Sequence, residues 1–194
     1  MKIVVITRPD FFVGEADIIN KMLGAGLPLM HIRKPMASIE EVENLIKNIN
    51  PVFADRLVLH DFHSLAVKYN LYGVHLNSRN PYAPDNWHGS ISRSTHSLAE
   101  LIVDSKRYNY SFLSPVFNSI SKENYNSGFT LSQLKQAALE GVINDKVFAL
   151  GGVTADKVPL LKDVGFGGAA LLGEVWNNAD NIDAYMSRLL SFAK

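Results

Sequence analysis

Two apolar segments near the end of the chain, each followed by glycine, constrain its fold more than any other feature. Residues 147–150 run into Gly151 and Gly152, and residues 168–172 run into Gly173. A stretch of helical character separates the two segments, which gives the order strand, helix, strand. Glycine at a strand end lets backbone N–H groups approach a ligand without a Cβ in the way. Because the loops after strands 7 and 8 of (β/α)₈ barrels often bind phosphate, the pattern predicts a phosphate-binding barrel.

Short apolar segments alternate with amphipathic segments along the rest of the chain, which favours a parallel sheet. Eight strands within 194 residues favour closure, so we expect a compact single-domain α/β protein, a (β/α)₈ TIM barrel over residues 1–194. An open doubly wound sheet is the alternative. The expected strands lie near 3–6, 29–32, 57–60, 73–76, 90–94, 110–113, 147–150 and 169–172. The expected helices lie near 16–25, 39–48, 64–70, 98–105, 131–139, 155–164 and 182–193.

Composition narrows the classes of partner. Lys plus Arg and Asp plus Glu both number 19, so no overall basic field attracts nucleic acid. The chain has no cysteine, which excludes disulfides and thiolate chemistry. The first apolar run is too short for a signal peptide or a membrane span, so we expect a cytoplasmic protein with no nucleic-acid or membrane partner.

Polar residues recur where the expected strands end. His31 and Arg33 share one strand face, His60 ends the third strand, His75 the fourth and Ser94 the fifth. In a parallel barrel these ends meet on the catalytic face. The alternative for each histidine is a buried ring bonded to backbone. A site for a transition metal, held by imidazoles, is a further alternative.

Three features suit a diphosphate and its metal. Asp61 is a candidate Mg²⁺ ligand, or else the N-cap of the next helix. Arg33 offers a planar fork for phosphate, or else an ion pair at the barrel rim. Ser119, Ser121 and Lys122 combine hydroxyl and ammonium groups suited to a diphosphate, within a polar segment, 118–128, that is a candidate mobile lid.

The order and spacing of several short motifs resemble thiamine-phosphate synthase and its sister group, the TenI-like thiazole tautomerases. The similarity extends from the first strand to the last helix. The motifs are Met30-His31-Ile32-Arg33, Leu59-His60-Asp61, Gly73-Val74-His75-Leu76, Ser94-Thr95-His96-Ser97, Ser114-Pro115-Val116-Phe117 with Ser119-Ile120-Ser121-Lys122, and Leu150-Gly151-Gly152-Val153-Thr154.

This resemblance implies a transferase that joins hydroxymethylpyrimidine diphosphate to thiazole phosphate and releases diphosphate with Mg²⁺, through a cationic pyrimidine intermediate. It also allows a homodimer. Carried over residue by residue, the implied roles are diphosphate binding by Arg33, Ser119, Ser121 and Lys122, a Mg²⁺ ligand at Asp61, a pyrimidine contact at Ser94, and a thiazole-phosphate cradle at Gly151, Gly152, Leu172 and Gly173.

Departures from the family pattern leave two other functions open. His31 and His60 replace a glutamine and an asparagine of the synthases, and Asn80 replaces the second Mg²⁺ aspartate, which weakens the expected magnesium site. A TenI-like isomerase would use His31, His60 or His96, because the tautomerase's own catalytic histidine maps onto Pro115. The other function is a non-catalytic protein that binds thiazole or thiamine phosphate.

Overall fold

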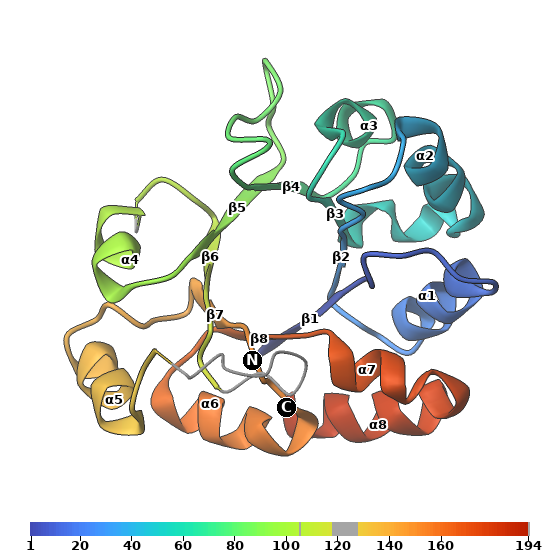
Figure 1. Cartoon of the computed structure of the whole chain (residues 1–194). Helices are drawn as coiled ribbons and strands as arrows, with labels where there is room; N and C mark the ends of the chain where they lie inside the picture. Colours follow the sequence, from blue (N-terminus) through green and yellow to red (C-terminus); the bar gives the residue numbers. More distant parts are fainter. Residues whose placement is uncertain (105, 118–127, 194) are drawn as a thin grey trace.

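In the computed structural model, which describes residues 1–104, 106–117 and 128–193, eight parallel strands close into a barrel in sequence order (Figure 1). Each strand pairs with the next one along the chain, and β8 returns to pair with β1. This confirms the barrel and excludes the open sheet. The strands are β1 (Lys2–Ile6), β2 (Leu29–Ile32), β3 (Leu57–Leu59), β4 (Gly73–Leu76), β5 (Ser90–Thr95), β6 (Tyr110–Leu113), β7 (Val147–Ala149) and β8 (Gly168–Leu171).

Helices surround the barrel, except between β4 and β5, where the fully described residues 77–89 form a loop (Figure 1). The segment expected as one helix over 155–164 begins as a 3₁₀ turn and continues as α6. A five-residue helix, α7, was not predicted, because it is too short to show a periodic pattern. The α-helices are α1 (Glu15–Gly24), α2 (Ile39–Asn48), α3 (His63–Lys68), α4 (Leu98–Asp104), α5 (Leu131–Leu139), α6 (Val158–Val164), α7 (Gly173–Asn177) and α8 (Ile182–Ala193).

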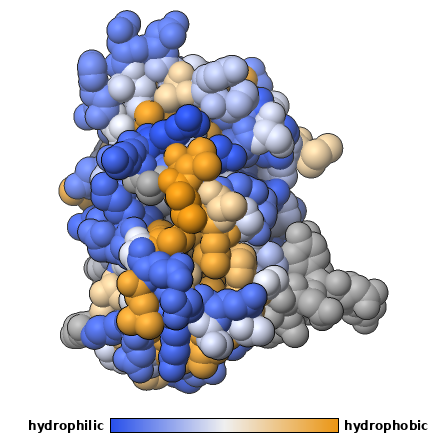
Figure 2. All heavy atoms as spheres, turned by 90° about the vertical axis from the view of Figure 1, so that its left-hand side faces the viewer, coloured by the Kyte–Doolittle hydropathy of each residue, from blue (hydrophilic) through white to orange (hydrophobic). Residues whose placement is uncertain are grey.

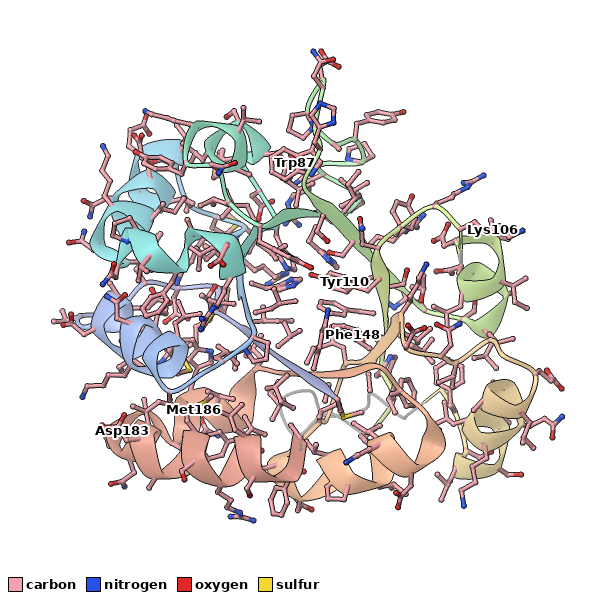
Figure 3. All side chains as sticks on the ribbon, turned by 180° about the vertical axis from the view of Figure 1, so that it is seen from behind. Trp87, Lys106, Tyr110, Phe148, Asp183 and Met186 are labelled. Atoms are coloured by element: carbon pink, nitrogen blue, oxygen red, sulfur yellow. The ribbon has the colours of Figure 1, made fainter. Side chains whose placement is uncertain are left out.

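The barrel interior is a packed core that aromatic rings dominate on one side. Tyr110 and Phe148 project into it from neighbouring strands, and their rings stack at 4.7 Å between centroids (Figure 3). A Cβ at Gly168 would lie 2.5 Å from the Phe148 ring, so glycine on β8 makes room for that ring. Alternate residues of each strand face outward and pack against the helices. These packed aromatic rings therefore close the barrel interior beneath the polar side chains at the strand ends.

The outer surface carries an apolar stripe on the side of α4 and α5 (Figure 2). Exposed apolar side chains of these two helices are Ile102, Val103, Leu131 and Leu139. The homodimer stays a prediction, and this stripe is where it would be examined first. No helix in the described part of the chain is long and apolar enough to cross a membrane.

Candidate active site at the strand ends

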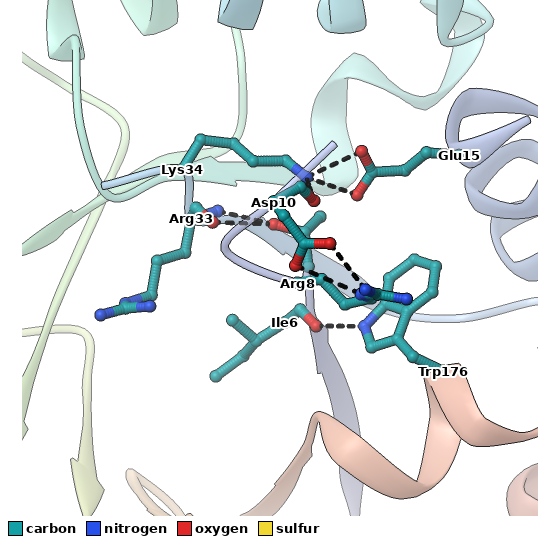
Figure 4. A network of polar contacts seen from close by, with 8 residues as sticks. Ile6, Arg8, Asp10, Glu15, Arg33, Lys34 and Trp176 are labelled. Carbon is teal, nitrogen blue, oxygen red and sulfur yellow. Dashed lines mark hydrogen bonds and ion pairs between the residues drawn. The ribbon is translucent and has the colours of Figure 1, made fainter. Parts of the chain in front are cut away.

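Arg33 and Lys34 leave the end of β2 in opposite directions (Figure 4). The Arg33 backbone N–H donates to Thr7 Oγ1 at 2.9 Å, and the Thr7 hydroxyl donates to the Arg33 carbonyl at 3.2 Å, which joins the ends of β1 and β2. The Arg33 side chain is half-buried and makes no ion pair with any residue that the structure describes. The rim ion pair considered for Arg33 is therefore not found, and its guanidinium remains a candidate anion ligand.

Lys34, just beyond the end of β2, uses all its donors on neighbouring residues. Its Nζ donates to Glu15 Oε1 at 2.6 Å, to Glu15 Oε2 at 2.7 Å and to the Asp10 carbonyl at 2.8 Å (Figure 4). Burial raises the pKa of Glu15 and lowers the pKa of Lys34, while their hydrogen bonds act in the opposite direction on both. Because all three ammonium donors are used, Lys34 holds the loop between β1 and α1 in place and offers nothing to a ligand.

Asp61 lies at the end of β3 with one carboxylate oxygen paired and the other free. Its Oδ1 accepts from Arg79 Nη2 at 2.9 Å and from Asn80 Nδ2 at 2.9 Å. Its Oδ2 is buried and has no hydrogen-bond partner among the described residues. The N-cap position of α3 belongs to Phe62, in a left-handed conformation and without a side-chain cap bond. The capping role considered for Asp61 is therefore wrong.

Three predicted strand-end histidines lie inside the barrel. His31 Nδ1 is 2.9 Å from His60 Nε2, and His31 Nε2 is 2.7 Å from the Tyr110 hydroxyl. His31 has no exposed surface and His60 is 5% exposed. Both ring nitrogens of His31 are thus occupied, so His31 can act on a bound substrate only through its neighbours, and of the two only His60 reaches the surface.

His75 is held between two serines of the neighbouring strand β5. Its Nδ1 is 2.9 Å from Ser92 Oγ, and its Nε2 is 3.0 Å from Ser94 Oγ. The Ser92 hydroxyl also donates to the Val74 carbonyl at 3.4 Å. Ser94 lies two residues nearer the strand end than Ser92 and is half-buried, so it belongs to the mouth of the barrel.

Burial keeps these imidazoles neutral. It lowers the pKa of His31 and of His60 well below the usual value, and lowers the pKa of His75 to about 3. Their candidate ligand atoms lie within 4.8 Å of one another, as a metal site would require. The His60 and His75 rings, however, stack at 24° between planes, and both nitrogens of His31 and His75 are hydrogen-bonded. We therefore interpret the cluster as a hydrogen-bonded network rather than a transition-metal site.

The tips of β7 and β8 lie side by side, as the pairing of Ala149 with Ala169 requires. Gly151 and Gly152 adopt φ values of 93° and 61°, a region in which only glycine is unstrained. A Cβ at Gly151 would also approach the Pro115 Cα to 2.8 Å. The N–H groups of Gly151, Gly152, Leu172 and Gly173 have no acceptor among the described residues.

Two charged side chains brace this pair of tips. Lys157 Nζ donates to the Gly152 carbonyl at 2.7 Å, which fixes the orientation of the peptide after Gly152. Glu174 Oε2 accepts from the Ala155 N–H at 2.7 Å and from the Tyr185 hydroxyl at 2.9 Å. One carboxylate therefore connects the loop after β7 with α7 and α8.

Several predicted ligands lie outside the described residues: Ser119, Ser121 and Lys122, with most of the candidate lid over 118–128. Five residues that complete the site were not predicted, namely Tyr110, Ser92, Arg79, Glu174 and Lys157. Spacing by two along a strand could have found Ser92 beside Ser94, because both then face the same side. Nothing in the sequence pairs Arg79 with Asp61, since a loop brings them together.

Comparisons with known proteins identify the family. A family model described as thiamine monophosphate synthase matches residues 3–175. The thiamine-phosphate synthase of Enterobacter sp. (strain 638) is 27% identical over 171 residues, covering 84% of this chain and 81% of that protein. The thiamine-phosphate synthase of Serratia proteamaculans (strain 568) is 26% identical over 179 residues, covering 87% and 83%.

Solved structures agree with this result. The crystal structure of thiamine phosphate pyrophosphorylase from Bacteroides thetaiotaomicron is 35% identical with a TM-score of 0.91, covering 100% of this chain and 98% of that one. Thiamine phosphate pyrophosphorylase from Pyrococcus furiosus, 20% identical with a TM-score of 0.79 over 98% and 94%, shares the fold. The family model, the relatives and the strand-end site together show that the chain belongs to the thiamine monophosphate synthase family and is a synthase-type enzyme of thiamine biosynthesis.

Proposed function

We propose that this enzyme joins hydroxymethylpyrimidine diphosphate to thiazole phosphate and releases diphosphate. One observation carries the proposal: four backbone N–H groups without described acceptors lie at the adjacent tips of β7 and β8, in a chain of the synthase family. Such groups suit a phosphate dianion, since each N–H donates to an oxygen without a competing side chain. The thiazole phosphate would bind here, at Gly151, Gly152, Leu172 and Gly173.

The diphosphate would bind at the other side of the mouth. The Arg33 guanidinium points away from the Lys34 network and makes no described ion pair, so it is available as a bidentate phosphate ligand (Figure 4). The resemblance adds Ser119, Ser121 and Lys122 as further diphosphate ligands and Ser94 as a contact of the pyrimidine. The packed floor of aromatic rings keeps bulk water from reaching a cationic pyrimidine from below.

Asp61 and Asn80 are suited to hold Mg²⁺. The buried Asp61 Oδ2 has no described partner, which is the state expected of a carboxylate oxygen intended for a cation, and Asn80 lies against the same carboxylate. Magnesium, when bound, neutralises charge that develops on the departing diphosphate. Arg79 forms an ion pair with Asp61. Its positive charge would therefore lie beside that of a bound Mg²⁺.

Diphosphate release from the two substrates, measured with and without Mg²⁺, tests the proposal. We expect Mg²⁺-dependent release that falls by about 10²-fold or more in Asp61→Ala. Asp55→Ala removes an exposed carboxylate outside the site and should retain the wild-type rate. Metal-independent isomerisation of a thiazole carboxylate without diphosphate release would replace this proposal with the tautomerase. Phosphate binding without either reaction would replace it with the non-catalytic protein.

A further inference from the structure

We propose that Arg79 is an internal counter-ion of Asp61, that Mg²⁺ displaces it, and that the displaced guanidinium then pairs with the diphosphate. Arg79 would lower the affinity of the site for free Mg²⁺ and favour Mg²⁺ that binds together with diphosphate. The contacts between Arg79 and Asp61 stand on geometry alone. The roles of the metal and the diphosphate rest on the proposed function.

The donors around Asp61 all gather on one of its two carboxylate oxygens. Asp61 Oδ1 accepts from Arg79 Nε at 3.2 Å, from Arg79 Nη2 at 2.9 Å and from Asn80 Nδ2 at 2.9 Å. Asp61 Oδ2 is buried and receives no donor from the described part of the chain. An arginine that only neutralised the carboxylate would favour the bidentate geometry, with one donor on each oxygen. The observed arrangement leaves one oxygen for a second cationic ligand.

The charges of the pair oppose the binding of a free cation. Asp61 and Arg79 together carry no net charge, and Asn80 adds none. Mg²⁺ prefers one or two carboxylates together with substrate phosphates. A cation that reached Asp61 with Arg79 in place would meet a positive charge on the same carboxylate. Free Mg²⁺ and the Arg79 guanidinium therefore compete for Asp61.

The Arg79 side chain can leave Asp61 while its backbone stays in place. The Asn77 side chain accepts from the Arg79 N–H at 2.9 Å and from the Asn80 N–H at 3.1 Å, and it donates to the His60 carbonyl at 2.6 Å. The Arg79 side chain is 47% exposed, and Asp61 is its sole partner among the described residues. Rotation of the side chain alone would therefore free Asp61.

A displaced guanidinium would still lie at the mouth of the barrel. Arg33 follows β2, Asp61 follows β3 and Arg79 follows β4, so all three lie at the same end of neighbouring strands. A guanidinium suits phosphate oxygens, and a diphosphate offers enough of them for both arginines and the metal. Displacement of Arg79 therefore costs less when diphosphate is present. By linkage, Mg²⁺ and diphosphate then strengthen each other's binding by the same factor.

The alternative is an ion pair that only anchors the loop over residues 77–89. Asn77 and Asn80 already attach this loop to the His60 carbonyl, at 2.6 Å and 3.3 Å. Ion pairs that involve a half-exposed arginine add little to stability. We therefore expect Arg79→Gln to fold as the wild type does, and the anchor alone predicts an unchanged affinity for Mg²⁺.

The first test measures how fast the Arg79 Nε–H proton exchanges with water in the intact chain. ¹H–¹⁵N spectra resolve this signal, and Arg79→Gln assigns it. We expect MgCl₂ to speed the exchange about tenfold, toward the rate in Asp61→Ala without metal, because the bond to Asp61 is lost. Addition of inorganic diphosphate together with MgCl₂ should slow it again. An exchange rate that bound Mg²⁺ leaves unchanged would overturn the proposal.

The second test uses titration calorimetry on Arg79→Gln. We expect MgCl₂ alone to bind about tenfold more tightly than to the wild type, because the competing charge is gone. Inorganic diphosphate in excess MgCl₂ should bind about 3- to 10-fold more weakly, because a phosphate ligand is lost. Damage to the fold would weaken both. Arg107→Gln removes an exposed arginine just before β6, at the opposite end of the barrel, and should change neither affinity.

The outcomes separate this inference from the proposed function. Equal affinity of the wild type and Arg79→Gln for Mg²⁺ would overturn the counter-ion role and leave the magnesium site intact. Tighter Mg²⁺ binding without weaker diphosphate binding would overturn the pairing of Arg79 with diphosphate. No binding of Mg²⁺ to either protein would contradict both the inference and the magnesium site. Affinities as expected, but no diphosphate release from the two substrates, would contradict the proposed function alone.

Discussion

The two sides of the barrel mouth use different parts of the chain to meet a ligand. At β7 and β8, glycine tips expose backbone N–H groups, and the nearest side chains serve as braces. At β2 to β5, buried side chains hydrogen-bond one another, and Arg33, His60, Asp61 and Ser94 reach toward the mouth.

The two sides of the mouth are therefore expected to respond differently to substitution. The backbone side depends on φ angles and on the absence of a Cβ, so it tolerates changes of charge but not of size. The side-chain side depends on every buried polar group having a partner, so it tolerates little loss of a donor or acceptor.

The largest effect on stability is expected at the Lys34–Glu15 ion pair, next to the end of β2 on the side of the mouth built from side chains. Glu15→Ala leaves Lys34 buried without a counter-charge, which should lower the free energy of unfolding by about 3–5 kcal/mol. Urea unfolding monitored by circular dichroism measures it. Asp17→Ala, which removes an exposed carboxylate from the same first turn of α1, should cost no more than about 1 kcal/mol. Equal losses in the two variants would contradict the distinction.

On the backbone side, Gly152→Val should weaken binding of thiazole phosphate about 30- to 100-fold, or 2–3 kcal/mol. A β-branched residue is strained at a φ of 61°, so the backbone of this tip should change its conformation. Titration calorimetry measures the affinity, with circular dichroism to verify folding. Gly24→Val, where a Cβ meets nothing within 4 Å, should bind as the wild type does. Unchanged affinity in Gly152→Val would exclude the cradle.

The pH dependence of unfolding tests the buried state of His75 on the side of the mouth built from side chains. The pKa of His75 is lowered to about 3 in the folded protein, against about 6.5 unfolded, so between these values the unfolded chain binds more protons. Stability contributed by His75 is complete above pH 6.5 and is lost as the pH falls toward 3, with a slope of up to about 1.4 kcal/mol per pH unit. His75→Gln should show a shallower slope in urea unfolding at stepped pH. Identical slopes would show that His75 titrates normally.

The smallest effect is expected at Lys157, which supports the glycine tip of β7. Lys157→Ala removes the contact with the Gly152 carbonyl, which should raise KM for thiazole phosphate about 3- to 10-fold, roughly 1 kcal/mol, with little change in kcat. Lys162→Ala, on the same helical segment, is the control. A fall in kcat with KM unchanged would show that Lys157 acts in the chemical step instead.

The fold followed from the sequence because its signals are local. Alternating apolar and amphipathic segments predicted every strand to within two residues, and glycine after the seventh and eighth strands marked the tips whose backbone N–H groups have no described acceptor. The short α7 was missed because five residues carry no period, and the 3₁₀ start of the segment before α6 has no signature distinct from a helix.

The site was predictable only in part, since its contacts join distant residues. Asp61 was singled out, but its partner Arg79 comes from a loop whose path depends on the whole β4–β5 connection. His31 was predicted to be catalytic from its place at a strand end, and the structure places it among Tyr110, His60 and Phe112 within the barrel. Which nitrogen of a histidine carries the proton is set by partners on the neighbouring strand, which no local pattern reveals.

The double contact of Glu174 connects the outer layer of helices to the proposed phosphate site. Tyr185 belongs to α8, on the outside of the barrel. Its hydroxyl donates to the same oxygen, Glu174 Oε2, that accepts from the Ala155 N–H in the loop after β7. A substitution at Tyr185, on the outside of the barrel, would therefore be felt by the backbone after β7 through one carboxylate oxygen.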